Sequence, residues 1–251
     1  MWTRAELKQI AKERMKANYW KMLLASLVVS LLTGSLFNIV YNINTTTQEI
    51  IYSEPYAYTV PPQHQNLFMM IVLLLLGTGT LFSILGIAYN IFISSVMEVG
   101  HSKFYINDRS QNANVRNVFF AFNHNYMNHV KIMFLMNVKI FLWTLVFIIP
   151  GIIKAYEYAM IPFILSEQPD ISSEEAFRLS KQLTDNEKFN LFILNLSFLG
   201  WLFLGALACG IGVIFVTPYV KATETELYFK LKEIKGIQIG TNIPPTPDFI
   251  L

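Results

Sequence analysis

The sequence predicts an all-α protein, a polytopic bundle of about six transmembrane helices with an amphipathic helix at its N-terminus. Hydrophobic residues make up 53% of the 251 residues and charged residues only 14%, whereas soluble domains carry about 25% charged residues. The apolar residues form blocks of at least 20 residues, which is the length a helix needs to cross a hydrocarbon core of about 30 Å. The charges lie between these blocks, as expected of a multi-pass membrane protein.

Residues 1–21 are expected to form a basic amphipathic helix. Thr3 and Glu6 fit a capping box, and Lys8, Lys12 and Lys16 form a row at i, i+4 spacing. Such a row suits a membrane surface with anionic headgroups, and a solvated basic helix is the alternative. We therefore expect the lipid bilayer, and not nucleic acid, to be the partner of this helix.

The bundle is expected over residues 22–230, followed by an extended cytoplasmic tail over 231–251. Lys and Arg number six in the first 21 residues, none in 42–66 and four in 98–131. Because Lys and Arg favour the cytoplasmic side, this bias predicts a cytoplasmic N-terminus and an outside loop at 42–66. The protein is then expected in the cell membrane, with both termini in the cytoplasm.

The number of spans depends on the apolar block 132–165. As one helix, these 34 residues would measure about 51 Å, well beyond the hydrocarbon core. Pro150 and Gly151 mark a turn, which predicts a helical hairpin that returns 166–188 to the cytoplasm. A second hairpin, turning near 208–212, gives six spans; four long, kinked spans are the alternative.

Polar residues within the apolar blocks are the candidate functional residues. Lys154 and Glu157 are three residues apart on a helix and can form an ion pair; next to the hairpin turn, they are expected near the outer surface. A second set consists of small or polar residues that share one face of the block 67–97. It comprises Gly79, Ser83, Gly86, Asn90 and Ser94. This seam suits helix packing or the wall of a cavity, and Asn195 is expected to hydrogen-bond between helices.

Signatures of catalysis are absent from the sequence. It contains no H-E-x-x-H, G-x-S-x-G, P-loop or G-x-G-x-x-G motif, and His124 and His129 lack the i, i+4 spacing of metal ligands. We therefore expect no enzyme activity, no cofactor and no metal site.

A set of residues spread from Glu6 to Tyr228 carries a family likeness. The set is Glu6-Leu7-Lys8, Ala11-Lys12, Asn18-Tyr19-Trp20-Lys21, Pro150-Gly151-Ile152-Ile153, Tyr158, Ala176, Ser180, Ser197-Phe198, Gly200-Trp201, Pro218-Tyr219 and Tyr228. In order and spacing it resembles the bacterial integral membrane family catalogued as domain of unknown function 975. The resemblance implies a bacterial plasma-membrane location and no established activity or cofactor. One departure is Asn186-Glu187-Lys188, where similar sequences often have a glycine before the lysine.

Three functional hypotheses follow. The first is a non-enzymatic membrane protein that handles an amphiphile, lipid or peptide, in transport, export or self-protection; it rests on the polar seam and the Pro-Gly hairpin. The second is a scaffold or accessory subunit that binds a partner membrane protein or a second copy of itself, through the N-terminal helix and the Pro-rich tail. An intramembrane enzyme is the third.

Overall fold

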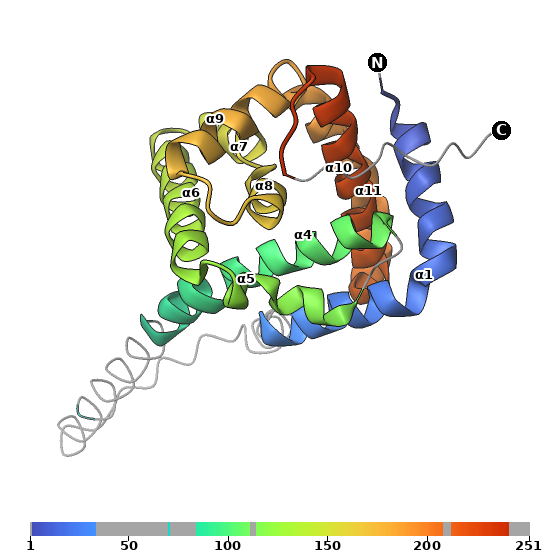
Figure 1. The fold of residues 1–251 in the computed structure, drawn as a ribbon, viewed down its shortest axis with the longest axis horizontal. Helices are drawn as coiled ribbons and strands as arrows, with labels where there is room; N and C mark the ends of the chain where they lie inside the picture. Colours follow the sequence, from blue (N-terminus) through green and yellow to red (C-terminus); the bar gives the residue numbers. More distant parts are fainter. Residues whose placement is uncertain (1, 34–69, 71–83, 111–113, 208–211, 241–251) are drawn as a thin grey trace, which may run out of the picture.

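The computed structural model describes residues 2–33, 70, 84–110, 114–207 and 212–240, and every regular element among them is a helix. This confirms the predicted all-α class. In Figure 1, α1 and α11 run along one edge, α6 and α7 occupy the opposite edge, α4 crosses between them and α8 lies in the middle. The elements are α1 (Arg4–Leu32), η2 (Asn90–Ser94), α4 (Ser95–Arg109), η3 (Val115–Phe119), α5 (Phe120–Asn123), α6 (Tyr126–Val146), α7 (Ile148–Glu157), α8 (Ile161–Glu167), α9 (Ser173–Thr184), α10 (Lys188–Leu207) and α11 (Gly212–Lys235).

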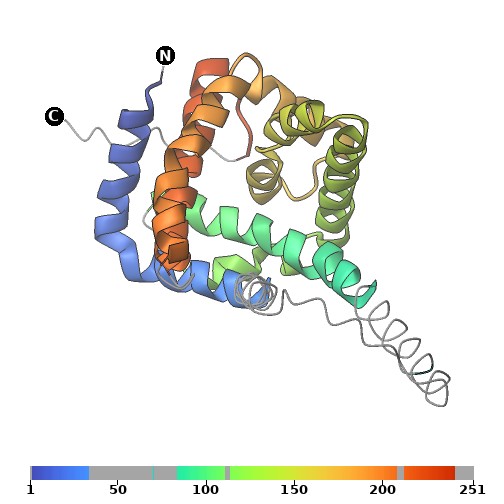
Figure 2. The same ribbon diagram turned by 180° about the vertical axis from the view of Figure 1, so that it is seen from behind.

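Helix α1 joins the predicted basic helix to the start of the first apolar block. The hydroxyl of Thr3 accepts a hydrogen bond from the backbone N–H of Glu6, as the capping box predicts. Asn18 has non-helical backbone angles, φ −128° and ψ 21°, and Asn is a poor helix former. The helix therefore bends there: its first half packs along α11, and its apolar second half runs beside α4 and η3 (Figures 1 and 2).

Helices α6 and α7 form the predicted hairpin, but the chain reverses at Phe147, three residues before Pro150. Phe147 is extended, with φ −155° and ψ 144°. Pro150 lies in the first turn of α7, where backbone N–H groups have no partner within the helix. The lack of an N–H in proline therefore costs no helical hydrogen bond there. A Cβ added at Gly151 would lie 2.2 Å from the Thr144 hydroxyl and 2.7 Å from the Thr144 Cα. Gly151 thus lets the two helices approach closely, and Phe147 provides the turn.

Helices α10 and α11 form a second antiparallel hairpin, as the sequence predicts. Near its closed end, a Cβ added at Gly205 would lie 2.8 Å from the Gly212 carbonyl carbon. At its open end, Lys235 donates a hydrogen bond to the carbonyl of Asp185, just before α10. The connecting residues 208–211, with most of the predicted turn, lie outside the described residues.

Helix α9 is the polar helix between the hairpins. Ser172 caps it by accepting a hydrogen bond from the N–H of Glu175 at 3.2 Å. Beyond its end, Asn186 has φ 58°, a left-handed conformation that glycine favours and asparagine tolerates. Asn186 thus adopts, just before Glu187 and Lys188, a conformation that is otherwise most common for glycine.

The interior combines apolar packing with ion pairs between helices that are distant in the sequence. The short helix α8 is buried from Ile161 to Ser166, and Phe163 stacks on Tyr228 of α11 with ring centroids 5.2 Å apart. Arg14 of α1 pairs with Glu226 of α11 and with Asp108 of α4, the latter at 3.2 Å. These ion pairs join the N-terminal helix to α4 and α11.

Four helical stretches among the described residues are long and apolar enough to cross a membrane. They are Ile84–Arg109, Tyr126–Val146, Ile148–Glu167 and Lys188–Gly205. The third is interrupted by a turn between Glu157 and Ile161, so that α7 alone, with ten residues, is about 15 Å long. These stretches fit a membrane protein. The six-span topology stays a prediction, because most of 34–83 lies outside the described residues.

Candidate functional site

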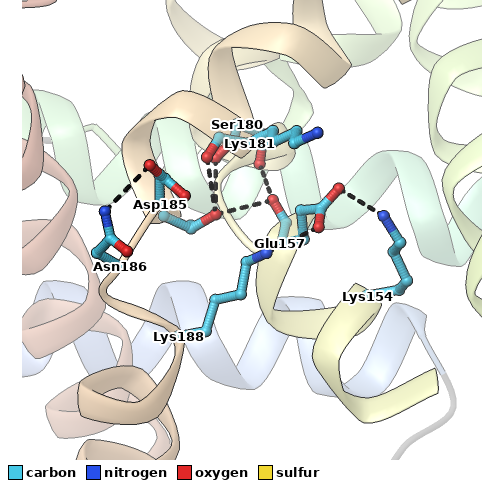
Figure 3. Close-up of polar contacts among 8 residues, drawn as sticks. Lys154, Glu157, Ser180, Lys181, Asp185, Asn186 and Lys188 are labelled. Atoms are coloured by element: carbon cyan, nitrogen blue, oxygen red, sulfur yellow. Dashed lines mark hydrogen bonds and ion pairs between the residues drawn. The ribbon is translucent and has the colours of Figure 1, made fainter. Parts of the chain in front are cut away.

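The predicted Lys154–Glu157 ion pair forms and is part of a larger cluster. Lys154 donates a hydrogen bond to the Glu157 carboxylate at 2.8 Å, and Lys188 donates to its other oxygen at 2.9 Å. The backbone carbonyl of Glu157 accepts hydrogen bonds from the hydroxyls of Ser180 and Thr184 on α9. Figure 3 shows Glu157 between Lys154 and the residues of α9. The cluster joins α7, α9 and the start of α10.

The position of this cluster differs from the expectation. The sequence suggests a pair beside the hairpin turn, whereas Glu157 is the last residue of α7, at the end away from Phe147. The reason is that the turn comes earlier than Pro150 and α7 stops after ten residues, where the hydroxyls of α9 bind its C-terminus. Only 5% of the Glu157 side chain is exposed, so little of it is open to a ligand. The role of the cluster is therefore to hold the helices together.

The predicted polar seam is only partly assembled. Gly79 and Ser83 lie outside the described residues, and Gly86 has no described atom within 4 Å of where a Cβ would be. Asn90 is exposed, and Ser94 is half-buried. The π-helix η2 spans Asn90 to Ser94, and its i→i+5 bonding gives the side chains a different angular spacing from that of the α-helix on which the seam is predicted.

A second ion pair, between Glu98 of α4 and Lys221 of α11, lies between two cavities. Lys221 also pairs with Glu224, one turn further along α11, at 3.0 Å. Cavities of about 320 Å³ and about 300 Å³ are both lined by Glu98 and Lys221. The pair is therefore the shared wall of two spaces inside an apolar bundle, and this makes it the principal candidate site.

The larger cavity, cavity 1, lies among α4, α7, α8, α10 and α11. Its polar lining includes Glu224, Tyr156 and Asn195, and its apolar lining includes Phe163 and Leu191. Asn195 also approaches the Tyr156 hydroxyl, at 3.5 Å, so that it links α10 to α7 as an interhelical contact. Asn195 is thus the predicted residue that reaches the principal site from α10.

The smaller cavity, cavity 2, lies among α1, α4 and α11. Ser94 is the member of the predicted seam that lines it, together with Ser30, Thr33, His101 and Thr217 among its polar residues. Its apolar lining comes from Val29, Val213 and Ile214. Both cavities therefore combine apolar walls with a few polar groups, as small-molecule sites do.

Behind cavity 2 lies a buried hydrogen-bonded group. The Ser26 hydroxyl is 3.3 Å from His101 Nε2 and 3.0 Å from the Tyr105 hydroxyl. A serine beside a histidine can act as a nucleophile, but Ser26 is fully buried and is not part of either cavity's lining. The arrangement satisfies three polar groups in the interior and fixes α1 against α4.

Glu98 and Lys221 could not be recognised as a site from the sequence, because both stand at the edges of apolar blocks, where a charged residue is typical of the end of a loop. A weak signal exists, since Glu98, His101 and Tyr105 recur at three- and four-residue spacing and Lys221 and Glu224 are three apart. These spacings place each set on one helix face. They do not reveal that the two faces meet.

The basic row of the N-terminal helix divides between two environments. Lys8 is half-buried, donates to the Ser197 carbonyl at 3.4 Å and lies 4.3 Å from the centre of the Phe198 ring. Burial, together with the charges of Arg4 and Lys12, lowers the pKa of Lys8. Lys12 is 5.9 Å from the Tyr219 ring centre, and Lys16 is exposed. Lys16 is thus the residue of the row that is most available to contact the headgroups of a membrane.

Comparison with known proteins gives a family without an assigned function. The family described as "Protein of unknown function (DUF975)" matches residues 1–156 and 144–235. No curated protein and no solved structure matches the chain. Within the described residues, no group of three or more His, Cys, Asp or Glu side chains could hold a metal ion.

Proposed function

Because the chain belongs to the DUF975 family of proteins of unknown function, we propose a function from its own geometry: a non-enzymatic integral membrane protein that binds an amphiphile. The observation that carries this proposal is the pair of cavities that share Glu98 and Lys221. An amphiphile needs apolar walls for its tail and a few fixed polar groups for its head, and each cavity offers both. Transport, export and self-protection all begin with such binding.

The size of the cavities supports a small ligand. Volumes of about 320 and 300 Å³ lie at the lower end of the ~300–1,000 Å³ typical of ligand sites. A single alkyl chain or a small lipid headgroup suits this volume better than a folded peptide. Of the three ligand classes that the sequence suggests, we therefore favour an amphiphile or lipid over a peptide.

We further propose that the protein lies in a bacterial cell membrane with both termini in the cytoplasm. The distribution of Lys and Arg supports this orientation, with six in the first 21 residues and none in 42–66. The two helical hairpins support it as well, because a hairpin returns the chain to the side from which it came. In this arrangement α9 lies on the cytoplasmic side.

The scaffold hypothesis has less support. It rests on the N-terminal helix and on the tail as free binding segments. The N-terminal helix packs along α11 and buries Leu7 and Ala11, which leaves less of it for a partner, and the tail from residue 241 onwards lies outside the described residues. We keep a partner protein as the second candidate.

Extraction of the protein with its surrounding lipid, without detergent, tests the proposal. Mass spectrometry of the co-purified molecules should find an amphiphile enriched over the bulk membrane. Ala159 lines cavity 1, so Ala159→Phe should fill that cavity and reduce the enrichment. Ala17→Phe, at an exposed position on α1, is the matched control. An identical set of co-purified molecules in wild type and Ala159→Phe would contradict binding in cavity 1, and co-purification of a stoichiometric protein instead would favour the scaffold.

A further inference from the structure

We infer that the amphiphile bound at the Glu98–Lys221 site carries a positively charged headgroup, such as an alkylammonium. This inference rests on the proposed function and adds the chemical class of the ligand. Among the described residues that line the two cavities, the charged side chains are Glu98, Glu224 and Lys221. Two carboxylates and one ammonium group leave one formal negative charge.

The excess charge matters because of its surroundings. Lys221 pairs with both carboxylates at once, so one lysine is shared between two partners. A charge among apolar groups is costly unless it is paired, and the attraction between opposite charges is stronger there than in water. A cationic headgroup would complete the pairing, whereas an anionic headgroup would add a further negative charge.

The carboxylates of the site are partly exposed, as a ligand-binding group must be. The side chains of Glu98 and Glu224 are 35% and 25% exposed, and that of Lys221 is 20% exposed. All three line cavity 1, so part of this exposed surface faces that space. The remaining ion pairs that bridge distant helices are more enclosed on their acidic side: the acidic partners Asp108, Glu157, Glu167 and Glu226 are at most 5% exposed.

The walls of cavity 1 are also suited to an ammonium group with an apolar body. The half-buried Tyr156 contributes an aromatic ring to the lining, and aromatic rings attract cations. Met160, Leu191 and Leu194, which are at most 4% exposed, form the apolar part of its wall. Carboxylate and aromatic groups can bind the cationic head, and the adjacent apolar wall can contact the alkyl chain.

Calorimetric titration of three matched probes tests the inference. The full-length protein is placed in nanodiscs of phosphatidylcholine, and octyltrimethylammonium, octyl glucoside and octyl sulfate are titrated below their micellar concentrations, with empty nanodiscs subtracted. The cationic probe should bind most tightly. Glu224→Gln should weaken its binding about ten-fold, which is the loss expected when a charge-assisted contact is removed. Lys221→Gln should strengthen it, because the site becomes more negative.

Glu233→Gln is the matched control, since Glu233 is on the same helix but 70% exposed, away from both cavities. If octyl sulfate or octyl glucoside binds as tightly as the cation, the inference about charge is overturned and amphiphile binding stands. If none of the three probes binds to the wild-type protein above empty nanodiscs, the proposed function itself fails. The comparison of probes on the wild-type protein does not depend on whether any variant folds.

Discussion

The carboxylate of Glu157 lies 2.9 Å from the ammonium group of Lys188, although 31 residues separate them. The contact joins the end of α7 to the start of α10 and thus connects the two helical hairpins. Lys154 binds the same carboxylate from within α7. One buried anion therefore holds two cations from different hairpins.

Replacing Glu157 by Gln should lower the free energy of unfolding by about 2 kcal/mol, within the range for hydrogen bonds to charged groups. The reason is that the substitution removes the only charge shared by Lys154 and Lys188 in this cluster and leaves the two ammonium groups near one another. Denaturant titration in mixed micelles, followed by tryptophan fluorescence, measures the change.

Glu175→Gln is the control for this substitution. Glu175 pairs with Arg178 on the exposed face of α9, and the pKa of Glu175 is lowered by its hydrogen bond from that arginine. Exposed pairs contribute little to stability, so this variant should unfold nearly as the wild type does. Equal losses for both variants would contradict the role assigned to Glu157.

The close crossing of α6 and α7 makes a second prediction. In Gly151→Ala, the new methyl group would lie 2.7 Å from the Cα of Thr144, and backbone cannot move aside as a flexible side chain can. We expect a loss of about 1–3 kcal/mol from overpacking. Gly200→Ala, where no described atom lies within 4 Å, should instead gain up to about 1 kcal/mol from helix propensity. A loss at both positions would show that packing at Gly151 is not the cause.

Much of this fold could be predicted from local signals in the sequence. Thr3 with Glu6 marks a helix start, and the length of 132–165 requires a break. Each of these signals depends on neighbours within a few residues, where helix geometry alone sets the outcome. The chain reverses three residues before the predicted position at Pro150. The reason is that proline is tolerated in the first turn of a helix, so Pro150 indicates only the approximate position of the turn.

The candidate site could not be predicted in the same way. Glu98 and Lys221 are 123 residues apart, and their meeting depends on how α4 and α11 pack. The bend at Asn18 is a further example, since it directs the first half of α1 along α11 and makes Lys8 a packing residue. The spacing of residues within one segment places them on one helix face, but it does not show which faces of two distant helices meet.

The left-handed conformation of Asn186 gives a third prediction. Asn186→Gly should be nearly neutral, because glycine adopts φ 58° without steric cost. Asn186→Ala should cost about 1 kcal/mol, since a Cβ clashes with the following carbonyl in this region. The free energies of unfolding of the two variants give the test, and a stability of Ala equal to that of Gly would contradict the assigned conformation.

The two environments of the basic row give a fourth prediction. Lys8→Gln should lower stability by about 0.5–1 kcal/mol through loss of the contact with the Phe198 ring. Lys16→Gln, at an exposed position, should leave stability unchanged and weaken association with anionic lipid by about 1 kcal/mol. Unfolding titrations and a comparison of native mass spectra in anionic and neutral nanodiscs separate the two effects. A loss of lipid association in Lys8→Gln alone would reverse the assignment.

The proposed orientation gives the last prediction, which labelling of intact cells tests. With Cys209 replaced by Ser, a single cysteine is introduced either at Thr46, in the segment 42–66 that lacks Lys and Arg, or at Glu174, an exposed position on α9. A membrane-impermeant thiol reagent should label the first variant in intact cells and the second only after the cells are broken. The hairpin α6–α7 predicts the second result, because it returns the chain to the side on which α6 begins. Labelling of the cysteine at 174 in intact cells would mean that the α7–α8 stretch ends on the outer side, and would overturn the cytoplasmic placement of α9.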